Sequence, residues 1–256
     1  MTPEPQWITT PHLRADHRGP VDRPYTPMVD PASAPPILEM LQSVARGQPD
    51  CVAIEEHDAR LTYRELIDKV EQLRAAIERA QPVPGRVGIL LPPSVDYAVA
   101  LFAVLAAGRP SVLLDESHPE TRNASIGAAT CINLVLAARD RGWPDAVTLR
   151  VARDADPRPS APLRAAPFGL DEPAFILCTS GSAGEPKPII HSQRTMLHWA
   201  RCTHDALHVR PDDRPLSLSS PASLGGFTGL VGFLLSGATA QMFDLRQHGL
   251  GGLSRR

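Results

Sequence analysis

The sequence predicts an α/β protein with layered, mostly parallel sheets flanked by helices. A continuous apolar run at 87–91, stopped by two prolines, is typical of a strand buried on both faces. A helical stretch and a second apolar run at 111–114 follow it, and this order of strand, helix and strand indicates a right-handed βαβ unit. Further short apolar runs predict strands at 132–137, 147–151, 175–178, 216–218 and 239–243.

The chain begins with a segment that has no periodic pattern. Residues 1–35 are rich in proline, and we interpret them as a tail or linker. We assign residues 36–256 to one domain, which is long enough to bury a sizeable core. Within it, apolar residues recur at helical spacing over 37–44, and a short buried strand is predicted at 51–54.

Two helix starts are marked by capping residues. Thr62 and Glu65 form a capping box, in which each side chain binds a backbone N–H that the helix leaves free. Ser94 is placed to cap a second helix over 95–107, which Gly108 ends. Further helices are predicted at 196–207 and 227–235, and another begins near residue 245.

Composition disfavours several classes of protein. The formal net charge is −2, so no basic excess favours nucleic acid as a partner. Four cysteines occur without a Cys-x-x-Cys pair, which argues against a zinc site or a disulfide framework, so no metal site is assigned. Free thiols and an N-terminus without a secretory signal favour a cytoplasmic protein. The uncharged stretch 215–243 contains Pro221 and five glycines, so a buried strand–helix–strand fits it better than a membrane span.

Small hydroxylated residues and glycines are concentrated at 179–187, which we call the glycine-rich loop. Glycine takes positive φ angles readily, so consecutive backbone N–H groups can turn inward around an anion. Hydroxyl groups and one lysine add donors, and each hydrogen bond to a charged group contributes roughly 1.5–3 kcal/mol. The residues assigned to this cofactor-binding site are Thr179, Ser180, Gly181, Ser182, Gly184 and Lys187.

The loop is not the Walker phosphate-binding motif, which needs adjacent Gly-Lys followed by Ser or Thr. Here Gly184 is followed by Glu185, and Lys187 by Pro188. An ordinary P-loop nucleoside triphosphatase is therefore disfavoured. A solvated connection is the alternative interpretation of any Ser/Gly-rich segment.

The loop sequence TSGSAGEPK resembles the signature loop of the adenylate-forming superfamily, which includes acyl-CoA synthetases, luciferases and adenylation domains of nonribosomal peptide synthetases. Two other segments, LTYREL and LAAGRPSVLLDESHPETR, resemble motifs of the same superfamily. The departures are Ala183, Pro188 and Gln193, at or near positions where Thr, Gly and His are usual. The residues of the longer segment that match in register are Leu105, Gly108, Asp115, Pro119 and Arg122.

The resemblance implies an ATP-dependent, carboxylate-activating ligase. In that family a carboxylic acid and ATP give an acyl-adenylate and pyrophosphate, and a thiol of coenzyme A or of carrier-protein phosphopantetheine then takes the acyl group. By resemblance, ATP and Mg²⁺ are the cofactors, and the glycine-rich loop holds the β- and γ-phosphates. Catalytic residues and a Mg²⁺ ligand are not identified in this chain.

The resemblance runs from about Ile37 to the last residue and covers the front part of the adenylate-forming fold. The family's later motifs for adenine, ribose, metal and the mobile lid are absent. We therefore expect residues 36–256 to be a truncated N-terminal part of an AMP-binding domain, incomplete at the C-terminus and inactive alone, with a missing C-terminal half as a candidate partner. Apolar faces around 231–243 are expected to be exposed and to favour self-association.

The substrate is a carboxylic acid whose identity the sequence constrains little. Amino-acid-activating members carry a Phe-Asp pair where this chain has residues 219–226, which include no acidic side chain. An aryl or aliphatic acid is favoured. Two other interpretations stay open: a non-catalytic nucleotide-binding or partner-binding module with the same fold, and an unrelated phosphate-binding α/β protein.

Overall fold

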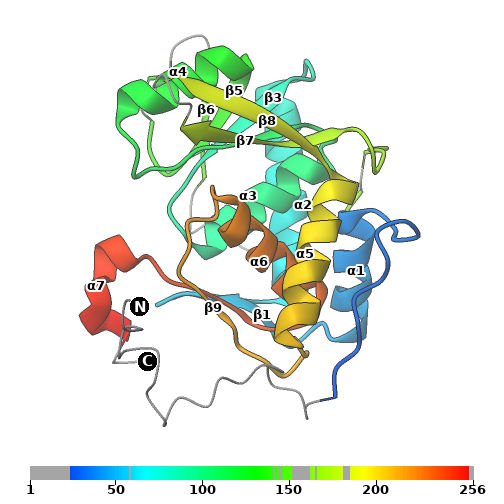
Figure 1. Ribbon diagram of the computed structural model, residues 1–256. Coiled ribbons are helices and arrows are strands. Elements are labelled where there is room, and N and C mark those ends of the chain that lie inside the picture. Colours follow the sequence, from blue (N-terminus) through cyan, green and yellow to red (C-terminus); the bar gives the residue numbers. More distant parts are fainter. Residues whose placement is uncertain are drawn as a thin grey trace, which may run out of the picture.

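Two β-sheets lie in separate layers with a layer of helices between them (Figure 1). The computed structural model describes residues 24–57, 59–140, 142–143, 146–151, 162–164, 166–180 and 185–253. The helices of the middle layer are α1 (Ile37–Gly47), α2 (Tyr63–Ala80), α3 (Val95–Ala106), α5 (Gln193–Leu207) and α6 (Leu224–Leu235). Two further helices, α4 (Glu120–Thr130) and α7 (Leu245–Leu253), lie outside this layer.

The larger sheet has the strand order β6-β5-β3-β4-β7-β8. Its first five strands are parallel, and only β8 runs antiparallel, beside β7. This arrangement confirms the mostly parallel sheet and the βαβ unit. The strands are β3 (Arg86–Leu90), β4 (Ser111–Leu113), β5 (Ile132–Ala137), β6 (Val147–Arg150), β7 (Pro173–Ser180) and β8 (Pro186–Ser192).

The smaller sheet has the order β2-β1-β10-β9. Strands β1, β10 and β9 are parallel, whereas β2 pairs with β1 in the antiparallel direction. Because β10 lies inside the sheet, both of its edges are paired. The strands are β1 (Val52–Glu55), β2 (Arg60–Thr62), β9 (Leu216–Ser217) and β10 (Ala240–Met242).

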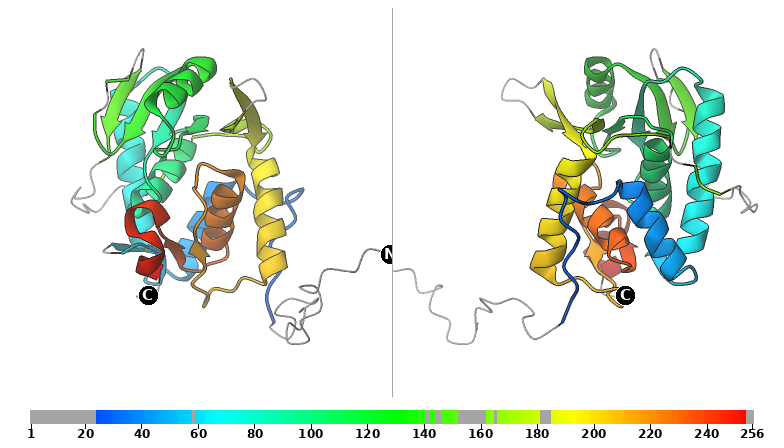
Figure 2. Two further views of the ribbon diagram at one scale, coloured as in Figure 1. Left: turned by 60° about the vertical axis from the view of Figure 1, so that its left-hand side comes forward. Right: turned by 90° about the vertical axis from the view of Figure 1, so that its right-hand side faces the viewer.

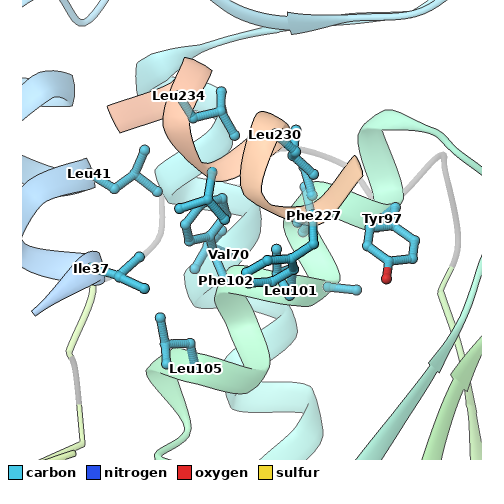
Figure 3. Close-up of a cluster of buried hydrophobic side chains, with 14 of the residues drawn as sticks. Ile37, Leu41, Val70, Tyr97, Leu101, Phe102, Leu105, Phe227, Leu230 and Leu234 are labelled. Atoms are coloured by element: carbon cyan, nitrogen blue, oxygen red, sulfur yellow. The ribbon is translucent and has the colours of Figure 1, made fainter. Parts of the chain in front are cut away.

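Helices α3 and α6 are buried on all sides. Every residue of α3 except Asp96 is buried, and so is every residue of α6 from Gly226 onwards. Side chains from α1, α2, α3 and α6 meet in this layer (Figure 3), and Phe227 of α6 packs against Phe175 of β7 with ring centroids 4.7 Å apart. A helix that is apolar all round belongs in the interior, so both sheets are needed to cover these two.

Strands β3, β4, β5 and β7 of the larger sheet are buried on both faces over most of their length, as their continuous apolar runs predict. Alternate residues of β7 illustrate this: Phe175 and Leu177 join the core between the sheets, whereas Ile176 packs on the outer face. The outer face is covered by α4, whose Ile126 belongs to the same apolar cluster as Ile176. Each strand therefore contributes to two cores, with a period of two residues.

The capping predictions are confirmed. The Thr62 side chain accepts a hydrogen bond from the Glu65 amide, and the Glu65 carboxylate accepts one from the Thr62 amide. Ser94 caps α3, and Gly108 beyond its C-terminus has a φ of 65°. That angle lies in the left-handed region that glycine adopts at least cost.

Gln193 has a structural role that its position in the sequence does not reveal. Helix α1 starts after Pro36, which offers no side-chain cap. The side-chain oxygen of Gln193, at the start of α5, accepts a hydrogen bond of 3.0 Å from the Ile37 amide, and its nitrogen donates one to the Phe168 carbonyl. The departure from the family pattern at this position therefore ties α1 to α5.

Three elements differ from the sequence-based expectations. Strand β2 and helix α4 were not predicted, and β8 lies between the glycine-rich loop and the helix expected after it. The expectation of exposed apolar faces around 231–243 is wrong, since Val231 and Phe243 are almost fully buried. Within the described residues, no helix is long and apolar enough to cross a membrane.

Truncation of Phe227 tests the coupling between the helix layer and the larger sheet. We expect Phe227→Ala to lower the free energy of unfolding by about 3–5 kcal/mol, because it leaves a cavity at a fully buried aromatic site. Urea denaturation measures the change. Val83→Ala, at a side chain that is 67% exposed, is the control and should change stability by no more than about 0.5 kcal/mol. Equal stabilities of the two variants would contradict this account of the core.

Candidate phosphate-binding site

The glycine-rich loop is the turn of the β7–β8 hairpin. Thr179 at the end of β7 pairs directly with Lys187 on β8, and both residues are exposed. Ser180 forms the last residue of β7 opposite Pro186. In both views of Figure 2 the hairpin, yellow-green to yellow, extends away from the helix layer. The other three predicted site residues, Gly181, Ser182 and Gly184, lie outside the described residues.

The hairpin presents this turn at the carboxyl edge of the larger sheet. Strand β7 is parallel to β4, so the two strands end on the same side of the sheet. Ligands of open parallel sheets bind at that edge. The second strand carries Pro186 and Pro188, which an edge strand tolerates because one of its sides needs no hydrogen bonds.

Asp115 follows β4 at the same edge and organises the turn that leads to α4. Its carboxylate accepts a hydrogen bond of 2.8 Å from the Ser117 amide, and its carbonyl accepts one from the side-chain nitrogen of Asn123. Burial raises the pKa of Asp115, but hydrogen bonds from Ser117 and Ser220 and the charge of His118 outweigh it and hold the pKa below its usual value. The carboxyl group is therefore ionised at neutral pH.

The contact between Ser220 and Asp115 joins the carboxyl edges of the two sheets. Ser220 follows β9 of the smaller sheet, within the stretch 219–226 that contains no acidic side chain. The turn into α6 is tight: a Cβ atom on Gly226 would lie 2.1 Å from the Ser220 carbonyl oxygen. Only glycine fits there, and Ser223 caps the helix by accepting a hydrogen bond from the Gly226 amide.

A cleft of about 340 Å³ opens where the two edges meet. Its walls come from residues that follow β3, β4, β9 and β10, among them Pro92, Asp115, Ser220 and Asp244. The walls are both polar and apolar, which is the usual character of a small-molecule site. Sequence reasoning did not find this cleft, because its lining residues are far apart in the chain.

Three histidines, one on β8 and two at the end of α5, are accounted for by burial or packing. His191 on β8 is partly buried, and burial lowers its pKa, so its ring is neutral at pH 7. His204 contacts Ser236 and the Thr26 carbonyl, and His208 stacks on Tyr25, so both hold the N-terminal segment against α5. All four cysteines are free thiols.

Among the residues that the structure describes, no group of three or more His, Cys, Asp or Glu side chains could hold a metal ion.

Comparison with known protein families identifies the family to which the chain belongs. The family model described as AMP-binding enzyme matches residues 41–250, most of the sequence. The chain belongs to the AMP-binding enzyme family. The resemblance found in the sequence motifs is confirmed.

Relatives of the chain in this family are adenylate-forming enzymes. The chain is 28% identical over 197 residues to the probable non-canonical nonribosomal peptide synthetase CymA of Salinispora arenicola, covering 72% of this chain and 2% of that protein. It is 29% identical to acetyl-coenzyme A synthetase of Nostoc linckia, covering 73% of this chain and 67% of that protein. The chain thus spans a small part of the nonribosomal synthetases that it matches.

Solved structures agree with the fold. The nonribosomal peptide synthetase FmoA3, in a form bound to α-methyl-L-serine-AMP, matches with a TM-score of 0.74 and 27% identity, over 84% of this chain and 25% of FmoA3. The N-terminal subdomain of Klebsiella oxytoca NpsA matches in fold with a TM-score of 0.70 at 21% identity, over 83% of this chain and 57% of that one. The architecture is that of the front part of an adenylation domain.

The low pKa of Asp115 makes part of the stability pH-dependent. The pKa is lower in the folded chain than the value of about 3.9 in an unfolded one. The stabilisation from Asp115 is therefore complete above about pH 4 and is lost as the pH falls through the lower, folded pKa. We expect the stability difference between the wild type and Asp115→Asn to be constant from pH 7 to 5 and to shrink below pH 4, measured by urea unfolding. A difference that is independent of pH down to pH 2.5 would contradict the assignment.

Proposed function

We propose that the chain is the ATP-binding front part of a carboxylate-activating, AMP-forming ligase. The observation that carries the proposal is the match of the AMP-binding family over 41–250, combined with a hairpin that delivers the glycine-rich loop to the carboxyl edge of a parallel sheet. In this proposal residues 1–35 are a tail and residues 36–256 are the N-terminal part of an adenylation domain. A solved relative at 26% identity, FmoA3, is described in an AMPPNP-bound form, which supports a nucleotide as the ligand.

The proposed role of the loop is to bind the β- and γ-phosphates of ATP and to hold pyrophosphate as it leaves. Thr179, Ser180 and Ser182 would donate through their hydroxyls, and Gly181 and Gly184 through the backbone. Lys187 pairs with Thr179 across the hairpin, so its charge lies beside the first hydroxyl of the set. Fixed donors of this kind stabilise charge that develops on a transferred group without reorganising during the reaction.

The remaining reactants are a carboxylic acid and a thiol. Nonribosomal peptide synthetase and acetyl-coenzyme A synthetase relatives support both classes of partner. Residues 219–226, where amino-acid-activating members carry a Phe-Asp pair, include no acidic side chain, which favours an aryl or aliphatic acid over one with a free α-amine. Mg²⁺, when bound with ATP, supplies charge neutralisation at the phosphates. We place the enzyme in the cytoplasm, where its four thiols stay reduced.

A non-catalytic module that binds nucleotide or a partner protein is the second candidate. The observation that favours it is the open edge of β8, where Ile189 and Ile190 are 44% and 55% exposed. The two candidates differ in one measurement, ATP–pyrophosphate exchange with a panel of carboxylic acids. Exchange by the chain together with an added C-terminal half of a relative supports the ligase, whereas nucleotide binding without exchange in that reconstituted pair supports the module.

Lys187→Ala tests the phosphate-binding role directly. We expect it to weaken binding of ATP and pyrophosphate by about 10- to 100-fold, because a charge-assisted hydrogen bond of roughly 1.5–3 kcal/mol is lost. Isothermal titration calorimetry measures both affinities. The control is Lys69→Ala, which removes the only other lysine of the chain, on α2, and should leave them unchanged. Equal effects of Lys187→Ala and Lys69→Ala on these affinities would contradict the phosphate-binding role of Lys187.

A further inference from the structure

A cavity of about 280 Å³ lies against the start of α4, outside the site described above. Its described walls come from the first two turns of α4, the end of β3 and the segment that follows β5. They include Leu90, Glu120, Asn123, Ala124 and Trp143. The proposed phosphate-binding role uses none of these side chains.

The cavity lies on the outer face of the larger sheet, away from the helix layer. Leu90 belongs to the apolar cluster on that face, together with Ile126 of α4. The next residue, Leu91, belongs to the core between the sheets and lines the cleft, in keeping with the alternation of side chains along an extended chain. The cavity and the cleft are therefore separate, and the end of β3 lies between them.

Asn123 brings a buried hydrogen-bond acceptor to the wall of this cavity. The residue is only 3% exposed, and its Nδ2 atom donates a hydrogen bond of 2.9 Å to the Asp115 carbonyl oxygen. Because a carbonyl oxygen can only accept, this contact fixes which way the amide is turned. The Oδ1 atom is buried and has no hydrogen-bond partner, which is costly for an amide. A donor on a molecule bound in the cavity can supply the missing hydrogen bond.

Trp143 gives the cavity an aromatic wall. The residue packs against the outer apolar cluster. Its indole ring lies so close to Gly127 of α4 that a Cβ atom there would be 2.7 Å from the ring. The ring therefore rests directly on the helix. Leu90 and Ala124 add apolar surface beside it, and an aromatic ligand can stack on such a wall.

The volume of the cavity and the charge of its walls limit the ligand. A cavity of roughly 150 Å³ with apolar walls is large enough to bind benzene, so about 280 Å³ accommodates a fused two-ring molecule. Glu120 is the ionisable side chain among the described lining residues, and its carboxylate disfavours an anion. Carboxylic acids and nucleotides, the ligands of the proposed reaction, therefore do not suit this cavity.

We propose that the cavity is a ligand site distinct from the cleft, which binds a neutral, flat, two-ring molecule that donates one hydrogen bond to Asn123 Oδ1. The same amide holds the Asp115 backbone through its Nδ2 atom, and Asp115 lines the cleft. A ligand in the cavity thus contacts the residue that fixes the turn after β4.

Indole and benzofuran test the proposal on the full wild-type chain, since they share one shape and differ in the N–H donor. We expect indole to bind about three- to tenfold more tightly than benzofuran, the difference that one hydrogen bond between neutral groups makes. Ligand-observed NMR titration measures both affinities, and nuclear Overhauser effects between indole and the Leu90 methyl groups locate the site. Saturating ATP should leave the indole affinity unchanged, because the proposed nucleotide site does not include the cavity.

Two matched substitutions on α4 separate filling of the cavity from a general change in the helix. Ala124→Leu adds a larger side chain to the cavity wall and should weaken indole binding by about tenfold or more. Ala128→Leu, one turn further along at an exposed position, should change the affinity by less than about twofold. In Asn123→Leu, indole and benzofuran should bind alike, and this comparison within one variant does not depend on the stability of the variant.

Equal affinities of indole and benzofuran for the wild type would overturn the hydrogen bond to Asn123 and with it the inference. Absence of indole binding, as expected if an ordered water alone satisfies Asn123 Oδ1, would also overturn it, and so would displacement of indole by ATP. The proposed ligase function is tested separately, by ATP–pyrophosphate exchange.

Discussion

The complete burial of α3 and α6 is the constraint on which the rest of the structure depends. Neither helix has a polar face, so each must be enclosed by other elements rather than laid on one sheet. The two sheets cover them from opposite sides, and α1, α2 and α5 close the flanks (Figure 1). The glycine at 232 lets α6 approach α5 closely, since a Cβ there would lie 3.2 Å from the Ala200 carbonyl oxygen.

The way in which the two sheets enclose these helices also determines where the cleft lies. Parallel strands from both sheets end near one another, and the segments that leave them carry Pro92, Asp115, Ser220 and Asp244 into one cleft. The polar contact between Asp115 and Ser220 links the sheets at this place. The hairpin adds a turn rich in donors at the edge of the larger sheet. The two-sheet body thus carries the β7–β8 hairpin and the cleft at the carboxyl edges of its strands.

The elements that the sequence predicts are those with strong local signals. The capping box at Thr62 and the apolar run at 87–91 were correctly placed, because hydrogen-bonding side chains and continuous burial leave a pattern in the chain. Helix α4 left no such pattern: its buried face consists of Asn123, Ile126, Gly127 and Thr130, of which only Ile126 is a large apolar residue. Its position depends on the sheet beneath it, and tertiary packing outweighs weak local preference.

The candidate site was predicted only in part, because only some of its residues leave a local pattern in the sequence. A glycine-rich loop is visible in the sequence, but β8 contains two prolines and is exposed over most of its length, so nothing in its composition predicts a strand. It forms because a short turn returns the chain along the free edge of β7. The pairing of Thr179 with Lys187 follows from that hairpin. Residue spacing along the chain does not predict this pairing.

A crystal structure of the full chain with bound ATP tests the central claim most directly. The account predicts β- or γ-phosphate oxygens within about 2.7–3.2 Å of donors of the glycine-rich loop, with the Lys187 ammonium group beside them. Phosphates bound elsewhere, for example in the cleft between Pro92 and Asp244, with the loop making no contact to the nucleotide, would contradict it.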